Sequence, residues 1–273
     1  MRWDDLRPSE NMDDRRGFGG GRMVMGGGGL GLVGVVLLAL VFGVDPSQLL
    51  GPMSQQSSYS QSGSRADDPS YQFTRRVVGS AEDIWSSLLR AQGVRFQPAV
   101  MTTYDYATPT GCGTGQAAAG PFYCPSDGHI YLDLTFFNEL ATRFGSPGDF
   151  ARAYVIAHEY GHHIQNLTGV MQRHGGRGAD SASVRIELQA DCYAGVWAFH
   201  ANQRFSVLQV GDVEEGLAAA SAVGDDTLAK QSGGRAVPDS FTHGSSAQRS
   251  TWFRRGLERG AMGDCDTFAA GRL

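Results

Sequence analysis

Two histidines four residues apart, inside a run of helix-forming residues, are the feature that most restricts what this chain can fold into. The run is DFARAYVIAHEYGHHIQNL, and it contains His158, Glu159 and His162 in an HExxH pattern. On an α-helix, side chains at positions i and i+4 project from the same face, so both imidazoles can reach one metal ion. Glu159 is turned by about 100° from His158 on such a helix, where it can reach a water molecule activated by the ion. The pattern therefore predicts half of a zinc site, with a base beside it.

A third ligand is predicted from two acidic residues further along the chain. Glu187 and Asp191 lie four residues apart in the otherwise apolar run SVRIELQADCYAGVWAF. Two acids on one helix face repel each other, and an apolar helix offers no compensation unless a metal ion or a histidine is near. We therefore assign Glu187 as the third zinc ligand and Asp191 as the acceptor that orients the ligand His158 through its other ring nitrogen. An exposed acidic face paired with Arg185 is the alternative.

Residues 23–44 form an uncharged stretch of membrane-spanning length. The stretch has 22 residues, which at about 1.5 Å per residue match a hydrocarbon core of about 30 Å. Arg15, Arg16 and Arg22 precede it, whereas residues 45–64 carry no Lys or Arg. The positive-inside rule then places the N-terminus in the cytoplasm and the bulk of the chain outside. A cleaved signal peptide and a secreted protein are the alternative, although no small-x-small cleavage site follows the stretch.

These features divide the chain into four parts. We predict a cytoplasmic N-terminal segment at residues 1–22, a transmembrane helix at 23–44, a flexible linker at 45–70 and a folded domain at 71–273. The linker is predicted because its residues are rich in Ser, Gln and Pro and show almost no aliphatic pattern.

The folded domain combines several helices with a short hairpin. Helix-start signals occur at Ser80, Ser146, Asp212 and Ser245. Between the first two of them, PFYCPSDGHIYLDL predicts two short strands joined by a turn. The predicted fold class is therefore α+β, mainly helical, with a small antiparallel sheet.

Four cysteines agree with a position outside the cytoplasm, where an even number indicates disulfides. They are Cys112, Cys124, Cys192 and Cys265. Cys112 and Cys124 flank the predicted hairpin and would close a short loop, which favours pairing them with each other and pairing Cys192 with Cys265. The other connectivities remain open, and four buried thiols are the alternative.

The charge balance argues against nucleic acid as a partner. The chain has 23 Lys and Arg against 28 Asp and Glu, a net charge of −5. Such a chain has no overall basic surface for binding phosphate backbones.

Long strings of the sequence resemble one protein family. HEYGHH and ELQADCYAG resemble the gluzincin metallopeptidases. The strings MRWDDLRPSENMDDRRG, GPFYCPSDGHIYLD, GDFARAYVIAHEYGHHIQN and VPDSFTHGSSAQRSTWFRRGLERG are similar to the bacterial neutral zinc metallopeptidases, a membrane-anchored group. The similarity covers nearly the whole chain outside the linker. It implies a zincin-like fold, with His158, His162 and Glu187 as metal ligands and Glu159 as the catalytic residue.

The resemblance also implies a donor that stabilises the oxyanion of the reaction. Thr242-His243-Gly244, followed by Arg249, resembles a segment that approaches the active site in related gluzincins. His243 or Arg249 would then be the catalytic donor. An ordinary surface charge for Arg249 and a turn position for His243 are the alternatives.

The predicted function is that of a membrane-anchored zinc metalloendopeptidase. One Zn²⁺ per chain and Glu159 as general base would hydrolyse peptide bonds of a peptide or protein substrate. The predicted location is the bacterial inner membrane, crossed once, with the catalytic domain outside the cytoplasm. The alternative is a catalytically silent, zinc-stabilised interaction module outside the cytoplasm, with its site closed by a fourth ligand such as His243. The oligomeric state is not predicted.

Overall fold

The computed structural model describes residues 1–17, 65–173, 175–269, 271 and 273. Within them, seven α-helices and several 3₁₀ turns accompany two small sheets, which confirms the predicted α+β class. The helices are α3 (Pro69–Ala91), α4 (Phe136–Thr142), α5 (Asp149–Leu167), α6 (Ala182–Phe205), α7 (Asp212–Ala222), α8 (Asp225–Gln231) and α9 (Ser246–Arg259). The strands are β1 (Met12–Asp14), β2 (Val100–Thr103), β3 (Ala107–Thr110), β4 (Gly113–Gln116), β5 (Phe122–Cys124) and β6 (His129–Leu132).

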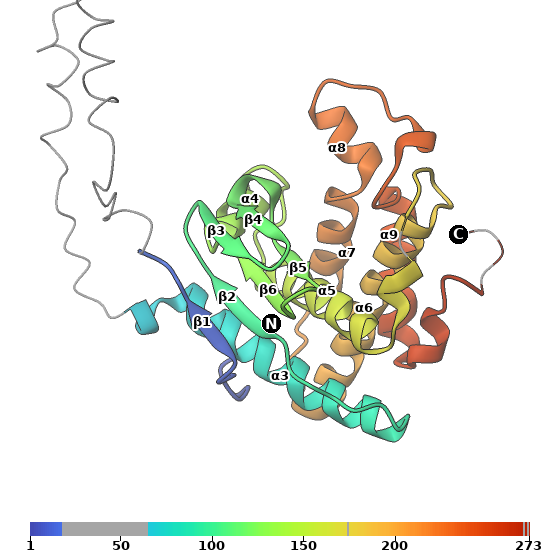
Figure 1. Cartoon of the computed structure of the whole chain (residues 1–273). Helices are drawn as coiled ribbons and strands as arrows, with labels where there is room; N and C mark the ends of the chain where they lie inside the picture. Colours follow the sequence, from blue (N-terminus) through green and yellow to red (C-terminus); the bar gives the residue numbers. More distant parts are fainter. Residues whose placement is uncertain (18–64, 174, 270, 272) are drawn as a thin grey trace, which may run out of the picture.

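The larger sheet is mixed rather than antiparallel. Its strand order is β1-β2-β6-β5, and β3 and β4 form a separate two-stranded sheet. The predicted hairpin is present as the antiparallel pair β5 and β6, but β1, β2 and β6 run parallel to one another. The predicted antiparallel hairpin is thus confirmed, whereas the parallel pairs join segments distant in sequence, which no hairpin signal marks. Figure 1 shows the strands on one side of the molecule and α7, α8 and α9 on the other, with α5 and α6 between them.

The helices of the core cross at very short distances. Helix α6 packs against both α5 and α9. A Cβ atom added at Gly195 of α6 would lie 2.2 Å from the carbonyl oxygen of Phe253, and one at Gly256 of α9 would lie 1.9 Å from that of Cys192. Glycine at both positions therefore lets the two backbones touch. This contact fixes α9 beside the helix that carries Glu187.

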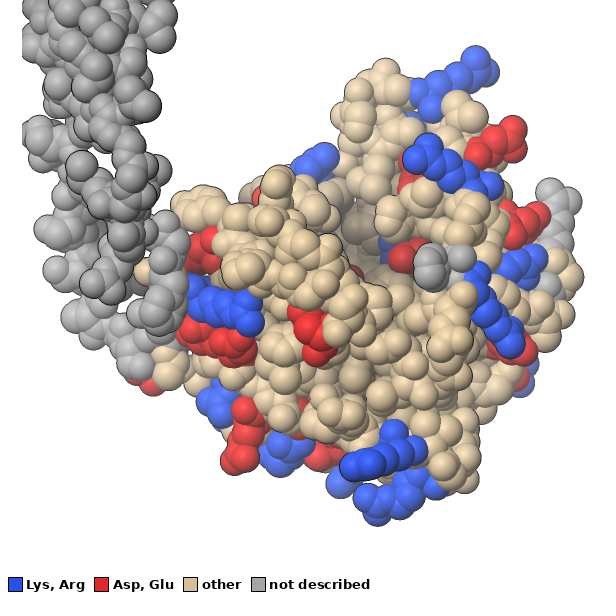
Figure 2. Space-filling view, in the orientation of Figure 1, with Lys and Arg blue, Asp and Glu red and all other residues tan. Residues whose placement is uncertain are grey.

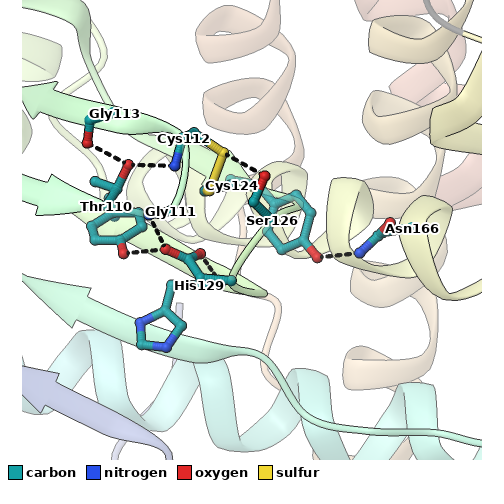
Figure 3. The surroundings of a disulfide bond; sticks show 11 residues. Thr110, Gly111, Cys112, Gly113, Cys124, Ser126, His129 and Asn166 are labelled. Atoms are coloured by element: carbon teal, nitrogen blue, oxygen red, sulfur yellow. Dashed lines mark hydrogen bonds between the residues drawn. A yellow bond between two sulfur atoms is a disulfide. The ribbon is translucent and has the colours of Figure 1, made fainter.

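Two disulfides connect the described cysteines in the pairing that the sequence favours. Cys112 bonds to Cys124, and Cys192 bonds to Cys265. The first joins the β3–β4 loop to the end of β5, as Figure 3 shows. The second ties α6 to the 3₁₀ turn η6 (Met262–Cys265), which follows α9. Each disulfide thus braces an element that borders the site described below.

The first 17 residues belong to the folded domain, which corrects the prediction of a separate segment at residues 1–22. Strand β1 pairs parallel with β2, from Met12 opposite Met101 to Asp14 opposite Thr103. Leu6 is only 1% exposed and lies in the hydrophobic core. A parallel pairing across so many residues leaves no local pattern in the sequence, so the short strand was missed.

The predicted linker also ends earlier than residue 70. The 3₁₀ turn η2 (Arg65–Asp67) and helix α3 begin within it. Helix α3 starts at Pro69, not at Ser80, because the Asp68 side chain accepts the backbone N–H groups of Ser70 and Tyr71 as an N-cap. Ser80, which the sequence predicted as a helix start, therefore lies inside the helix, and its hydroxyl donates to the carbonyl oxygen of Val77.

The predicted transmembrane helix at residues 23–44 lies outside the described residues. Within the described part of the chain, no helix combines the length and the apolar character needed to span a membrane.

Candidate metal centre

The crossing of α5 and α6 brings the three predicted ligands together. Their backbones meet at Gly161, where an added Cβ atom would lie 3.0 Å from the carbonyl oxygen of Ala190. Nε2 of His158 is 3.3 Å from Oε2 of Glu187, and Nε2 of His162 is 3.5 Å from Oε1 of the same carboxylate. One ligand atom from each of the three residues lies within 4.8 Å of the others. The helix spacing thus supplies the imidazoles, and the packing of α6 supplies the carboxylate.

These separations suit a zinc ion. Two ligands held at about 2.0–2.1 Å from a tetrahedral ion lie about 3.3–3.4 Å apart. The two imidazole-to-carboxylate distances are close to this value, and both imidazoles are almost buried. Two nitrogens and one carboxylate oxygen are also a donor set that zinc accepts, with one position left over. The residues present therefore fit the ion that the sequence predicts.

The charges at the centre also favour a cation. Burial by itself lowers the pKa of an imidazole, but the Asp191 and Glu187 carboxylates outweigh it and raise the pKa of His158. For His162, burial also lowers the pKa, and Glu187 raises it further than burial lowers it. Burial raises the pKa of Glu187, yet the two imidazoles hold it well below its usual range. The two imidazoles and the Glu187 carboxylate together therefore favour a bound positive charge. Without a metal ion, this charge comes from protons on the imidazoles.

A buried network orients His158. Its Nδ1 lies 2.8 Å from Oδ1 of Asp191, which makes Asp191 the acceptor expected from the sequence position. The Tyr154 hydroxyl donates to the same carboxylate oxygen at 2.5 Å. Arg249 donates to both oxygens, through Nε at 2.8 Å and Nη2 at 2.9 Å. Because Nδ1 faces a carboxylate, it carries the proton, and Nε2 is left to bind a metal.

A second chain of hydrogen bonds orients His162. Its Nδ1 lies 2.8 Å from Oε1 of Gln165, one turn further along α5. The Gln165 amide nitrogen then donates to the carbonyl oxygen of Ile186 and to the side-chain oxygen of Gln189, both on α6. Gln165 is completely buried. The Gln165 amide therefore sets the tautomer of His162 and connects this histidine to α6, the helix that carries Glu187.

The three ligands lie in the wall of a cavity of about 650 Å³. Figure 2 shows the molecule hollowed between the part that carries the strands and α4 and the part that carries α7 and α8. The lining includes Gly120, Pro121, Phe122 and Tyr123 from β5 and the residues before it. Glu159, His243 and Arg249 also line it, so the predicted base and both predicted donors lie around the same space as the ligands.

His243 is held at the cavity by a carboxylate that the sequence did not single out. Its Nδ1 lies 3.2 Å from Oδ1 of Asp225, at the first turn of α8. Oδ2 of Asp225 accepts the backbone N–H groups of Thr242, His243 and Gly244 at 2.8, 2.8 and 3.0 Å. The hydrogen bond that His243 donates to the Asp225 carboxylate raises the pKa of His243 against the opposing effect of burial. The His243 side chain is 51% exposed and can meet a bound ligand.

The Arg249 guanidinium is bound by protein groups at the cavity wall. Its side chain is 5% exposed, and its nitrogens bond to Asp191, to Tyr154 and to the carbonyl oxygen of Val223. Burial raises the pKa of the Asp191 carboxyl, and the charges of Arg249 and His158 together bring it below its usual range. Arg249 thus positions Asp191 beside His158, and its role as an oxyanion donor stays a prediction.

Three site residues were missed by sequence reasoning. Tyr154 and Gln165 carry a usable signal, because they lie four residues before His158 and three after His162 and so share the ligand face of α5. Asp225 has no such signal, since it reaches His243 only through the fold.

Comparisons with known proteins agree with this centre. The model of a family described as "Putative neutral zinc metallopeptidase" matches residues 1–268. The chain is 46% identical over 285 residues to the Escherichia coli K12 "Uncharacterized protein YpfJ", covering 98% of this chain and 99% of that protein. It is 43% identical over 260 residues to the Mycobacterium tuberculosis H37Rv "Uncharacterized protein Rv2575", covering 86% of each. No solved structure matched the chain.

Proposed function

Because the chain belongs to the neutral zinc metallopeptidase family, we propose that it hydrolyses peptide bonds at the centre formed by His158, His162 and Glu187. The observation that carries this proposal is the convergence of the three ligand atoms on one side of a large cavity that Glu159 also lines. A structural zinc site is closed by four protein ligands, whereas a catalytic one keeps a position open. Among the described residues, the candidate ligand group comprises these three and does not include His243.

The chemistry divides between the ion and two side chains. His158, His162 and Glu187 would hold a zinc ion, which would supply Lewis-acid polarisation of a peptide carbonyl and of water. Glu159 accepts a proton from the attacking water and delivers it to the nitrogen that leaves. His243, whose pKa is raised by its hydrogen bond to Asp225, donates in its protonated form to the carbonyl oxygen as negative charge develops on it.

The edge of β5 supports an extended substrate. Strand β5 is the outer strand of its sheet, and residues 120–123 line the cavity. Its position against the ligand helix is fixed because the Tyr123 hydroxyl accepts from Asn166 at 2.8 Å and lies 3.2 Å from Nδ1 of His163. An extended peptide can therefore pair with this edge by backbone hydrogen bonds. We propose unfolded or extended polypeptides as the substrate class.

The two disulfides support a location outside the cytoplasm. We propose that the domain works there, and that residues 23–44 attach it to a membrane.

Purified full-length protein tests the proposed activity. Loaded with zinc, it should degrade unfolded casein, lose this activity on treatment with a zinc chelator, and regain it when zinc is restored. Fragments are measured by gel electrophoresis and mass spectrometry. A zinc-loaded chain that leaves casein and other unfolded polypeptides intact would favour the silent interaction module.

Replacing Asp225 by asparagine should change the pH dependence of hydrolysis. The protonated form of His243 is the donor, so activity is lost as the pH rises through its pKa. Asp225 raises that pKa, and Asp225→Asn removes the charge that does so. The alkaline limb of the kcat/KM profile should therefore move to lower pH, with zinc content unchanged. An alkaline limb at the same pH in both proteins would exclude His243 as the titrating donor.

A further inference from the structure

The two ends of the segment 18–64 meet at one place in the fold. Arg16 lies just before the segment and Asp68 just after it, and Nη1 of Arg16 is 2.5 Å from Oδ2 of Asp68. The Arg16 guanidinium also stacks over the Tyr71 ring, at 4.7 Å from its centroid. Arg16 is only 7% exposed. Figure 1 shows the end of β1 beside the start of α3. The described residues on either side of positions 18–64 are therefore neighbours in the fold.

Helix α3 carries two residues, Gly79 and Glu82, that contact the first residues of the chain. Glu82 of α3 is 7% exposed, and its carboxylate accepts from Arg7 at 2.7 Å, Ser9 at 2.5 Å and Asn11 at 2.9 Å. Burying a carboxylate without such partners costs free energy of folding, and the three donors to Glu82 all lie in residues 1–17. A Cβ atom at Gly79 would lie 2.0 Å from the carbonyl oxygen of Arg7, so this position must be glycine for the segment to dock.

The docked segment cannot also lie across a membrane from the domain. The hydrogen-bonded ladder of β1 with β2 and the burial of Leu6 place residues 1–17 inside the same fold as α3. A single crossing within residues 18–64 would separate β1 from β2 by the thickness of a bilayer, about 30 Å. The two arrangements exclude each other.

Two crossings would return the chain to its own side, but the segment lacks the apolar length for them. Two helical spans require about 40 apolar residues at about 1.5 Å per residue. The uncharged apolar stretch has 22 residues, and residues 45–64 are rich in Ser, Gln and Pro. We propose that residues 1–17 and 65–273 occupy one compartment, so that the chain between them makes no net crossing of a membrane. This revises the single crossing expected from the sequence.

Cysteine labelling in cells tests the shared compartment. Glu10 and Glu258 are exposed glutamates, one in the N-terminal segment and one on α9. The variants Glu10→Cys and Glu258→Cys of the full chain are each treated with a membrane-impermeant maleimide, before and after lysis of intact spheroplasts. The native chain is the background control, because the four native cysteines form disulfides. The membrane fraction is isolated after labelling and lysis, so that attachment is scored separately.

Equal labelling of both variants before lysis is the expected result. Protection of both until lysis would still support one compartment, while contradicting the proposed location outside the cytoplasm. Labelling of Glu258→Cys before lysis and of Glu10→Cys only afterwards would overturn the proposal. The experiment requires no hydrolysis, so its outcome is independent of the proposed peptidase activity.

Discussion

The Glu159→Gln variant should lose hydrolysis of unfolded casein by about 10²–10⁴-fold, the range that a general base contributes. Glutamine keeps the size and hydrogen-bonding shape of the side chain, but it cannot accept a proton. Glu159 lines the cavity next to the ligand His158 and is not one of the three converging ligands. The zinc content of the variant, measured by atomic absorption, should therefore equal that of the parent protein.

Glu139 provides a matched control for this experiment. It lines the same cavity from α4 but does not belong to the ligand group. Glu139→Gln should retain activity within a few-fold of the parent. Equal turnover by Glu159→Gln and the parent would remove Glu159 from the mechanism.

The Glu187→Ala variant should lose both zinc and activity. Loss of an outer hydrogen-bond partner of a ligand costs about 10–100-fold in metal affinity, so loss of a ligand itself should cost more than about 100-fold. His158 and His162 would remain as a pair on α5, without the carboxylate that now lies 3.3 and 3.5 Å from them. Zinc bound per chain is measured after dialysis against a weak competing chelator.

Thermal unfolding gives an independent measure of this loss. A ligand that binds only the folded state raises the unfolding temperature, and at a given ligand concentration the rise grows with the logarithm of its affinity. Added zinc should raise the unfolding temperature of the parent and of Glu139→Ala, but not that of Glu187→Ala. A Glu187→Ala protein that retains one zinc per chain would show that the third ligand lies elsewhere.

The buried pair of Arg249 and Asp191 connects three helices, α5, α6 and α9, around His158. Asp191 is wholly buried, and Arg249, Tyr154 and His158 all contact it. An ionised carboxylate at such a depth needs compensation, and the bidentate guanidinium supplies it. The close crossing of α6 and α9 brings Arg249 within reach. The core packing and the ligand orientation therefore depend on the same contact.

Local spacing was enough to predict the ligand helix. His158 and His162 are four residues apart, and the 3.6-residue period of a helix places them on one face wherever that helix packs. Glu187 and Asp191 were recognisable for a similar reason, because paired acids in an apolar helix require a partner. The Ser245 capping box of α9 is likewise a local pattern, and the structure contains it.

Contacts between distant segments were not predictable in this way. The donors of Arg249 are engaged by Asp191, and Asp225 reaches His243 from another helix. Neither contact follows from the sequence around the residue concerned.

By itself, the sequence determined the α+β class, the helix that carries the candidate ligand histidines and its partner acids, and the favoured cysteine pairing, because each depends on periodicity or spacing within a short stretch. Only the tertiary structure decided that residues 1–17 contribute strand β1 and pack into the core beside α3. The partners of β1 and Glu82 come from segments many residues away, and the free energy that holds them together exists only once those segments have packed.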